Sequence, residues 1–292
     1  MAREKGSLLE TLARGGVAVL NADDPRVRAM QRPGLPVVSY GTGPGAALRF
    51  EYEPAAGRLR VWPPGARAPL AVRLGLPGRH NAANAAAALA ACHALGLELE
   101  PLVPALAAAK PPPQRLQRLA LGGVELLDDS YNANPASVQA ALEVLCTTAA
   151  ADGQAVGGRR IAVLGGMHEL GAQSRALHEA VGAAAAALGV DLLLGVGALG
   201  AAIVQGARAA GMPAERAQHC ESPEAAAAWL RAVLAPGDRV LLKASRAERL
   251  ERVVALLRAS GLQPARATPA EPRTPAAPGG EAEGSAKACP AA

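Results

Sequence analysis

Asp128-Asp129-Ser130-Tyr131-Asn132-Ala133-Asn134-Pro135 lies between an apolar run and an amphipathic run, and the rest of the chain can be placed around it. Residues 124–127 are typical of a buried strand, and residues 136–145 are typical of a helix whose first turn accepts the proline. Polar side chains therefore crowd the carboxyl end of a strand, where open α/β sheets bind ligands. A strand-to-helix turn with local capping is the alternative, although such a turn does not require six polar side chains within seven residues.

The length and composition limit the classes of protein to which the chain can belong. Its 292 residues suffice for two domains, and with 2% aromatic residues the core must consist of Leu, Val and Ala. The net charge of +5 comes without a basic block interleaved with aromatics, which excludes nucleic-acid binding. We find no apolar run of membrane-spanning length and no signal peptide. The cysteines at 92, 146, 220 and 289 have no paired spacing, which favours a cytoplasmic protein with reduced thiols.

Before the proline run at residues 111–113, hydrophobic periodicity predicts a mixed α/β unit. Asp24-Pro25 has the pattern of a helix N-cap. The prolines cannot continue a helix and stiffen a linker, so we place a boundary between a domain of residues 1–110 and one of residues 111–265. In the first domain we expect a helical lead over 1–16, buried strands over 17–20 and 37–40, half-exposed antiparallel strands over 48–52, 59–61 and 70–74, and helices over 81–95 and 102–108.

After the proline run, strands and helices alternate, which predicts an α/β domain with a parallel sheet covered on both faces. Residues 266–292 lack periodicity and are rich in Pro, Ala, Gly and Glu, which predicts a disordered tail. Between them we expect a hairpin over 116–121 and 124–127, strands over 161–164, 192–194 and 240–242, and helices over 136–145, 173–188, 198–210, 222–234 and 246–259.

The segment Gly78-Arg79-His80-Asn81-Ala82-Ala83-Asn84 opens the helix predicted over residues 81–95. Asn81 and Asn84 lie three residues apart, so both amides face one side of the first turn. There they can bind the edge of a heterocycle, close to a helix N-terminus that attracts anions. Capping of the helix by His80 or Asn81 alone is the alternative.

Further candidate ligand-binding residues follow the proline run and the predicted strands. Arg115 lies on the expected hinge and can reach a phosphate or a ribose, or be merely solvated. Lys243 ends a strand, where a ligand-facing cation belongs. The glycines of segment 165–171 allow close approach to a ligand, but the spacing is not that of a dinucleotide fingerprint. The sequence contains no GxxxxGK followed by Ser or Thr, so these residues encode no Walker loop.

In combination, these motifs resemble the Mur ligases, the ATP-dependent family that extends the peptide of the bacterial cell-wall precursor. The similarity is greatest to the members that add D-alanyl-D-alanine to UDP-N-acetylmuramoyl-tripeptide, and it covers about residues 3–262. The resemblance implies an α/β fold class: a partial central ATPase domain, then a C-terminal Rossmann-like domain with a parallel sheet. The strings that carry it are residues 19–25, 78–84, 129–135, 165–171 and 243–246.

The resemblance also implies a chemistry and a set of site residues. With Mg²⁺, ATP phosphorylates the tripeptide carboxylate to an acyl phosphate, and the amine of D-alanyl-D-alanine then displaces the phosphate. The lobes would close about the hinge to bring Arg115 and Asp129 onto the nucleotide. The implied nucleotide contacts are His80, Asn81 and Asn84 for adenine, and Arg115 and Asp129 for ribose and phosphates. The implied acceptor contacts are Tyr131, Asn132, Ser245 and Arg246, and the implied catalytic residues are Asn134, Lys243 and Lys5. Lys5 would act as a carbamate that holds Mg²⁺; the alternative is an ordinary exposed lysine.

Three positions depart from the pattern of the family. Gln114 and Ala244 each replace a glycine, and Gly166 replaces an aspartate, which puts the substrate contact of its loop in question. The UDP-sugar domain, the Walker loop and the metal-binding Glu and His of the family lie upstream of the match. We therefore expect an incomplete enzyme, whether from a truncated gene, from a misplaced start codon, or as one half of a split enzyme with a separate N-terminal half as its partner. A non-catalytic nucleotide- or peptide-binding module derived from a Mur ligase is the alternative; residues 131–134 argue against a folylpolyglutamate synthetase.

Overall fold

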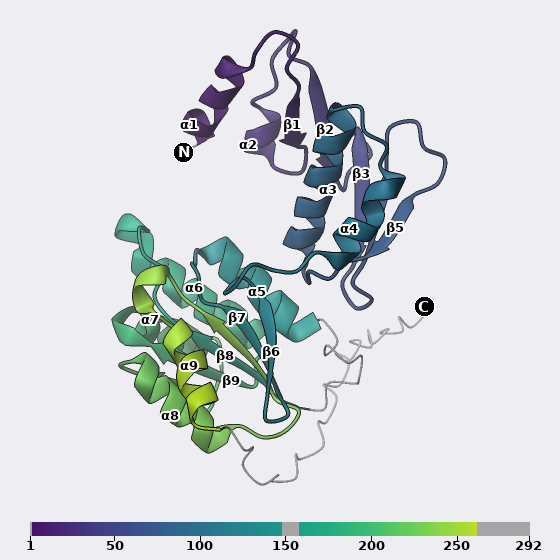
Figure 1. Ribbon diagram of the computed structural model, residues 1–292. Coiled ribbons are helices and arrows are strands. Elements are labelled where there is room, and N and C mark those ends of the chain that lie inside the picture. The colour runs from purple at the N-terminus through teal and green to yellow at the C-terminus, as the bar shows by residue number, and fades with distance from the viewer. Residues whose placement is uncertain (1, 148–157, 262–292) are drawn as a thin grey trace, which may run out of the picture.

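Two β-sheets, each with its own helices, form two lobes that the segment around the proline run joins (Figure 1). The computed structural model describes residues 2–147 and 158–261. The disordered tail expected over residues 266–292 lies outside the described residues. No helix in the described ranges is long and apolar enough to cross a membrane.

The first lobe is a five-stranded sheet in the order β1-β2-β3-β4-β5, parallel from β1 to β3 and antiparallel from β3 to β5. Asp24 caps a short helix as its pattern predicts, because its side chain accepts a hydrogen bond from the backbone N–H of Arg26 at 2.8 Å. The elements are α1 (Ala2–Gly6), η1 (Ser7–Thr11), β1 (Ala18–Asn21), α2 (Pro25–Arg28), β2 (Val37–Gly41), β3 (Leu48–Glu53), β4 (Arg58–Trp62), β5 (Leu70–Arg73), α3 (Arg79–Ala94), η2 (Glu100–Leu102) and α4 (Val103–Ala108).

Helix α3 covers one face of this sheet, and its small residues let it lie close. Ala82, Ala86 and Ala90 are fully buried against alternate residues of β3 and β4 such as Leu48 and Leu59. The other face of the strands carries charged side chains, as their period of two requires. The α3 helix is thus fixed by its core face, and its N-terminal end is directed at the second lobe.

The second lobe is a six-stranded sheet in the order β10-β9-β8-β11-β7-β6. All neighbouring strands are parallel except β6 and β7, which form the expected hairpin. The elements are β6 (Gln117–Leu121), β7 (Val124–Asp129), α5 (Pro135–Thr147), β8 (Arg160–Leu164), η3 (Gly171–Gln173), α6 (Ser174–Ala187), β9 (Leu192–Val196), α7 (Gly197–Ala209), β10 (Ala217–Cys220), α8 (Pro223–Val233), β11 (Arg239–Lys243), η4 (Arg246–Glu248) and α9 (Glu251–Ala259).

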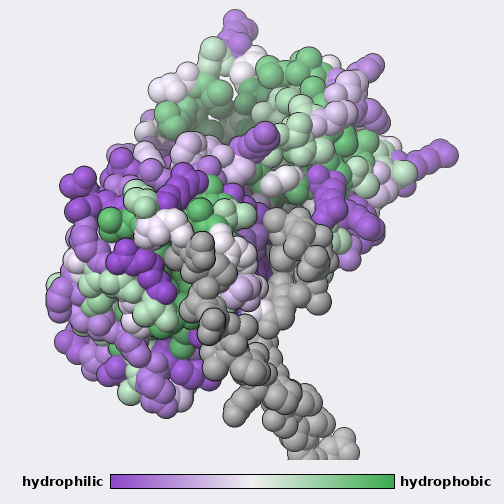
Figure 2. Space-filling view, turned by 60° about the horizontal axis from the view of Figure 1, so that its bottom comes forward, coloured by the Kyte–Doolittle hydropathy of each residue, from purple (hydrophilic) through white to green (hydrophobic). Residues whose placement is uncertain are grey.

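Two apolar cores, one on each face, hold this sheet between helices. Helices α5, α6 and α7 bury residues such as Leu142 and Ile203 on one face, and α8 and α9 bury Leu230 and Val253 on the other. The parallel sheet covered on both faces confirms the α/β fold class. In the view of Figure 2, hydrophilic residues cover much of the second lobe, whereas apolar residues gather on the visible surface of the first.

The structure differs from the sequence expectations at two places in this lobe. Strand β10 was not expected, since Ala217-Gln218-His219-Cys220 is short and polar. The helix expected over residues 246–259 begins only at Glu251, after a 3₁₀ turn and the left-handed Arg249. That interruption lies directly after β11, at the edge where the candidate site is found.

Candidate functional site

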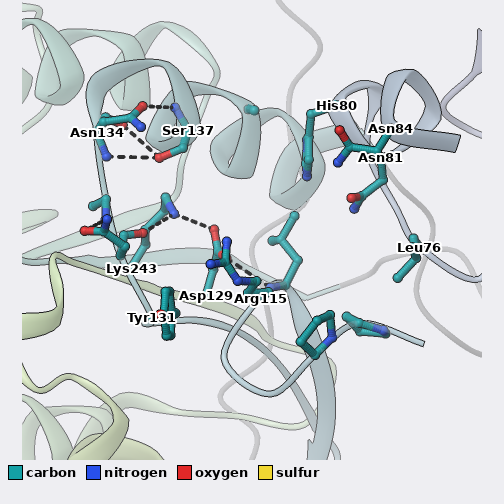
Figure 3. Close-up of a pocket in the computed structure, with 16 residues that line it drawn as sticks. Leu76, His80, Asn81, Asn84, Arg115, Asp129, Tyr131, Asn134, Ser137 and Lys243 are labelled. Carbon is teal, nitrogen blue, oxygen red and sulfur yellow. Dashed lines mark hydrogen bonds and ion pairs between the residues drawn. The ribbon is translucent and has the colours of Figure 1, made fainter. Parts of the chain in front are cut away.

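A cavity of about 450 Å³ lies between the lobes, where the N-terminal end of α3 faces the carboxyl ends of β7 and β11 (Figure 3). The proline run contributes Pro111 and Pro112 to its lining, and the segment that follows contributes Leu116. The cavity brings together most of the residues that the sequence singled out: His80, Asn81, Asn84, Arg115, Asp129, Tyr131, Asn132, Asn134 and Lys243.

An ion pair between Lys243 and Asp129 forms the strand-end wall of the cavity. Strands β11 and β7 pair in parallel with Lys243 opposite Asp129, so the sheet register alone brings the two side chains together. Lys243 Nζ donates to Asp129 Oδ2 at 2.6 Å and to the Asn132 carbonyl at 2.8 Å, and its side chain is only 3% exposed. Asp129 Oδ1 also accepts the backbone N–H of Leu116 at 3.1 Å. This carboxylate therefore ties the hinge segment to two strands.

Burial of Lys243 has a cost that its partner offsets in part. Desolvation lowers the pKa of Lys243, because the charged ammonium loses water, while the charge of Asp129 and its hydrogen bond raise it. Asp128, one residue earlier, faces the other way and accepts a hydrogen bond from Ser130 Oγ at 2.6 Å. Burial raises the pKa of Asp128. The two adjacent carboxyl groups therefore have different environments, and Asp129 is the one that reaches the cavity.

The backbone on either side of Arg115 is strained. Gln114 and Leu116 have φ values of 61° and 51°, which side-chain-bearing residues rarely adopt. The Arg115 guanidinium lies 4.3 Å from the centre of the Tyr131 ring, and that of Arg246 lies 5.8 Å from it. Gln114 Oε1 accepts a hydrogen bond from Arg246 at 2.7 Å, so the residue that departs from the family pattern holds the second arginine. Two cations on one aromatic ring form a surface suited to an anion.

The tip of α3 forms the opposite wall and keeps most of its polar groups unengaged. Gly78 precedes the helix with φ 102°, and no side chain caps this end, so the alternative of capping by His80 or Asn81 is wrong. Asn81 Nδ2 donates to the Pro77 carbonyl at 2.8 Å. Asn84 has no hydrogen-bond partner among the described residues. In Figure 3 both amides lie on the side of α3 that faces the strand-end wall.

His80 lies between the two asparagines and the strand end. Its Nδ1 is buried and has no hydrogen-bond partner in the described part of the chain. Burial lowers the pKa of His80, with smaller opposing effects from Asp129, which raises it, and Lys243, which lowers it. The lowered pKa favours the neutral ring, whose buried Nδ1 stays unsatisfied within this wall.

Asn134 lines the cavity but also has a structural role. Its Oδ1 accepts the backbone N–H of Ser137 at 2.9 Å, and Ser137 Oγ accepts the backbone N–H of Asn134 at 3.0 Å. This reciprocal pair caps α5 in front of Pro135. The capping interpretation of the stretch is thus correct for Asn134, while Asp129 and Asn132 face the cavity. The Asn-x-x-Ser spacing was the signal by which Ser137 could have been found.

The remaining predicted site residues lie outside the lining of the cavity. Ser245 Oγ donates to the Ala133 carbonyl at 3.3 Å, and Arg246 faces Tyr131 from the outer side. Lys5 lies exposed in α1, and its role as a carbamate stays a prediction. Among the residues that the structure describes, no group of three His, Cys, Asp or Glu side chains could hold a metal ion. The described residues therefore do not form a Mg²⁺ site by themselves.

The comparisons with known proteins agree with this geometry. Residues 1–92 match the Mur ligase middle domain, and residues 114–246 match the Mur ligase, glutamate ligase domain. UDP-N-acetylmuramoyl-tripeptide--D-alanyl-D-alanine ligase of Escherichia coli strain K12 is 34% identical over 271 residues, which cover 89% of this chain and 56% of that protein.

Solved structures of the same kind also match. MurF of Acinetobacter baumannii superposes with a TM-score of 0.74 at 27% identity, covering 88% of this chain and 55% of that one. MurF ligase of Thermotoga maritima in complex with ADP gives a TM-score of 0.68 at 26% identity, covering 83% and 53%. The chain spans about half the length of the curated relatives it matches. With its middle domain and its glutamate ligase domain both matched, the chain belongs to the Mur ligase family.

Proposed function

We propose that this chain provides the nucleotide- and acceptor-binding surfaces of an ATP-dependent amide ligase that adds D-alanyl-D-alanine to UDP-N-acetylmuramoyl-tripeptide in the cytoplasm. The observation that carries the proposal is the cavity itself. It places the Asn81 and Asn84 amides of one lobe opposite an ion-paired carboxylate and lysine of the other. When bound, ATP would supply the phosphoryl group that activates a carboxylate.

The helix tip is suited to the adenine end of the nucleotide. Asn81 and Asn84 present both donors and acceptors, which an adenine edge requires. The ring of His80, whose Nδ1 has no partner among the described residues, lines the same wall. The relative from Thermotoga maritima was solved with ADP, which supports a nucleotide for this chain as well.

The strand end and the hinge are suited to anionic groups. Arg115 is held over Tyr131 by a strained backbone, so little further ordering is needed when it meets a phosphate. Lys243 is fixed by Asp129 and by the Asn132 carbonyl, which leaves its charge close to the cavity without a mobile side chain. Preorganised cations of this kind stabilise charge that develops on transferring or leaving oxygens. Because the described residues do not form a metal cage, we assign no step to Mg²⁺.

Calorimetric titration of the 292-residue chain with ATP and, separately, with D-alanyl-D-alanine tests the proposal. We expect both ligands to bind, ATP more weakly in the variant Asn84→Ala and D-alanyl-D-alanine more weakly in the variant Arg246→Ala. Glu224→Ala is the matched control, since its ion pair with Arg252 lies on the surface of α8 and α9. Failure of both ligands to bind would contradict the proposal.

A non-catalytic binding module is the second candidate function. The capped Asn134 favours it, because a side-chain oxygen used in helix capping is less available for chemistry. Binding of the dipeptide without ATP would support this candidate over the ligase. Binding of both, followed by ATP-dependent amide formation once the tripeptide substrate is added, would exclude it.

A further inference from the structure

The first turn of α3 takes its position from one peptide unit, the one that joins Pro77 to Gly78. Both residues are buried, and no side chain caps the helix. The Gly78 carbonyl accepts the backbone N–H groups of Asn81 and Ala82, each at 3.1 Å, so the helix starts at this residue. Whatever fixes the Pro77–Gly78 unit therefore also fixes the polar side chains that the tip of α3 presents to the cavity.

The two polar groups of this peptide unit bind on opposite sides. The Gly78 N–H donates to the Tyr52 hydroxyl at 3.1 Å. The Pro77 carbonyl accepts a hydrogen bond from Asn81 Nδ2 at 2.8 Å. The peptide bond is trans, so its N–H and C=O groups point in opposite directions. A hydrogen-bonded path thus runs from Tyr52 of β3 through the peptide unit to Asn81, and rotation of that unit would weaken both bonds.

Further contacts confine the same peptide unit. A Cβ atom on Gly78 would lie 2.7 Å from Cε1 and 2.9 Å from Nδ1 of His80, and 2.9 Å from Cγ2 of Val144 in the second lobe. The backbone therefore passes closely between the His80 ring and α5. Tyr52 packs against the apolar core between α3 and its sheet, and its hydroxyl is the acceptor of the buried Gly78 N–H. Because a buried donor without an acceptor is costly, loss of that hydroxyl would make the peptide unit turn toward another acceptor.

The path also determines which end of the Asn81 amide is available to a ligand. A carbonyl oxygen only accepts hydrogen bonds, so the Pro77 carbonyl selects the nitrogen end of the amide. Asn81 lines the cavity, and its Oδ1 has no hydrogen-bond partner within residues 2–147 and 158–261 (Figure 3). The orientation of this amide is therefore set by the backbone before a ligand binds, and it leaves the oxygen available.

We propose that Tyr52 is a positioning residue for nucleotide binding. Through the Pro77–Gly78 peptide unit it holds Asn81 with the amide oxygen available, and this acceptor selects a purine with an amino group at position 6 over one with a carbonyl there. The inference rests on the proposed function, because it explains how the same wall distinguishes one base from another. An amino group donates to Asn81 Oδ1, whereas a carbonyl places two acceptors face to face and leaves the Asn81 oxygen unpaired.

Titration calorimetry of the 292-residue chain with ATP and with inosine triphosphate, whose base has a carbonyl at position 6, tests the inference. We expect the unmodified chain to bind ATP at least about tenfold more tightly than inosine triphosphate. In Tyr52→Phe the Asn81 amide can turn, so this preference should fall to about threefold or less, through weaker ATP binding. A Tyr52→Phe variant that keeps the full preference would overturn the inference. Equal loss of affinity for both nucleotides, which a purely structural change would cause, would also overturn it.

Tyr40→Phe is the matched control for the loss of a hydroxyl. Tyr40 lies in β2 and packs against the same core, but its hydroxyl has no hydrogen-bond partner in the part of the chain that the structure describes. Its removal should leave both affinities and their ratio unchanged. If Tyr40→Phe lowers the ratio as much as Tyr52→Phe does, the bond to Gly78 is not the cause and the inference is overturned.

A double-mutant cycle shows whether Tyr52 acts through Asn81. In the Asn81→Ala background the amide is absent, so Tyr52→Phe should weaken ATP binding by less than about twofold. A further loss as large as that in the unmodified background would mean that Tyr52 acts by another route, against the inference. Hydrogen exchange of the Gly78 amide should become faster in Tyr52→Phe and stay the same in Tyr40→Phe. Unchanged exchange in Tyr52→Phe would contradict the bond on which the path depends.

The same titrations separate the inference from the proposed function. If the unmodified chain binds D-alanyl-D-alanine but neither nucleotide, the nucleotide part of the proposed function fails and the inference fails with it. If the chain binds ATP and Tyr52→Phe keeps the preference for ATP, only the inference is overturned.

Discussion

The two walls of the cavity differ in whether their polar side chains have partners within the protein. On the strand-end wall, Lys243 and Asp129 are buried and need each other, since a buried charge without a partner is costly. On the helix-tip wall, Asn84 is neutral and has no partner within the described residues, and His80 leaves one nitrogen unsatisfied. The first wall is thus coupled to the stability of the fold, whereas the second is available to a ligand at little cost to stability.

The largest effect expected from this comparison is that of Asp129→Ala. The change leaves Lys243 as a buried, unpaired ammonium and also removes the acceptor of the Leu116 N–H. We expect the free energy of unfolding of the second lobe to fall by about 3–5 kcal/mol. Urea denaturation, followed by fluorescence of Trp229 in α8, measures it.

The matched control for this experiment is an exposed ion pair in the same lobe. Glu224→Ala breaks a contact of 2.6 Å to Arg252 at side chains that are 45% and 48% exposed, so its effect on stability should be much smaller than that of Asp129→Ala. The double variant Asp129→Asn/Lys243→Met should recover most of the loss, because it leaves no unpaired charge. Equal effects of Asp129→Ala and Glu224→Ala would refute the coupling of this wall to stability.

Gly78→Ala is expected to have the next largest effect, at the point where the helix-tip wall meets the other lobe. Gly78 has φ 102°, and a Cβ atom there would lie 2.7 Å from His80 Cε1 and 2.9 Å from Val144 Cγ2 of α5. We expect a loss of about 1–3 kcal/mol of stability from the strained backbone alone. Differential scanning calorimetry measures it.

The control is the glycine at the other end of α3. Gly96 also has a positive φ, 74°, but a Cβ atom there would meet nothing within 4 Å. Gly96→Ala therefore tests a positive φ without crowding, and the difference between the two variants reports the crowding of Gly78 by His80 of its own lobe and by Val144 of the other. If both variants lose the same stability, neither His80 nor Val144 crowds residue 78.

The comparison of the walls also indicates what the sequence could predict. The strand-end wall could be predicted in outline, because a buried strand and a helix-starting proline place Asp129 at a sheet edge, and Lys243 ends another strand. Their direct pairing could not be, since it depends on β11 lying next to β7 although more than a hundred residues separate them. Strand order in a parallel sheet is set by three-dimensional packing and leaves no local signal.

The backbone geometry around the site could not be predicted from the sequence either. Positive φ angles occur at four residues whose types do not favour them: Gln114, Leu116, Glu169 and Arg249. The residue types therefore do not indicate this backbone conformation. The Glu248 carboxylate lies in front of Gly166 only because the helix expected over residues 246–259 is interrupted after β11. At these positions tertiary packing overrides local preference, and one of them, Leu116, lines the cavity.

The variant Asn84→Ala tests whether the helix-tip wall contributes to ligand binding but not to stability. Because the side chain has no partner in the described residues, we expect the stability to change by less than about 0.5 kcal/mol. ATP affinity should fall by about threefold to tenfold, the value of one net hydrogen bond. Calorimetric titration and thermal unfolding of the same sample measure both. Asn84→Asp is a useful companion, since it keeps the shape and replaces the donor by a charge.

The smallest expected effect is the pH dependence that His80 gives to the helix-tip wall. Burial lowers the pKa of His80 in the folded state below its ordinary value of 6.5. Between that folded pKa and 6.5 the unfolded chain binds more protons, so the folded state loses stability as pH falls through this window and the loss is complete below the folded pKa. His80→Gln should flatten this part of the stability curve, and His93→Gln in the last turn of α3 is the control. In the unmodified chain, saturating ATP should make the stability depend more steeply on pH if a hydrogen-bond donor of ATP contacts Nδ1. Protonation of that nitrogen would then remove the acceptor. An unchanged pH profile in His80→Gln, with and without ATP, would mean that His80 takes no part in the function of this wall and that the asparagines alone make it suited to a ligand.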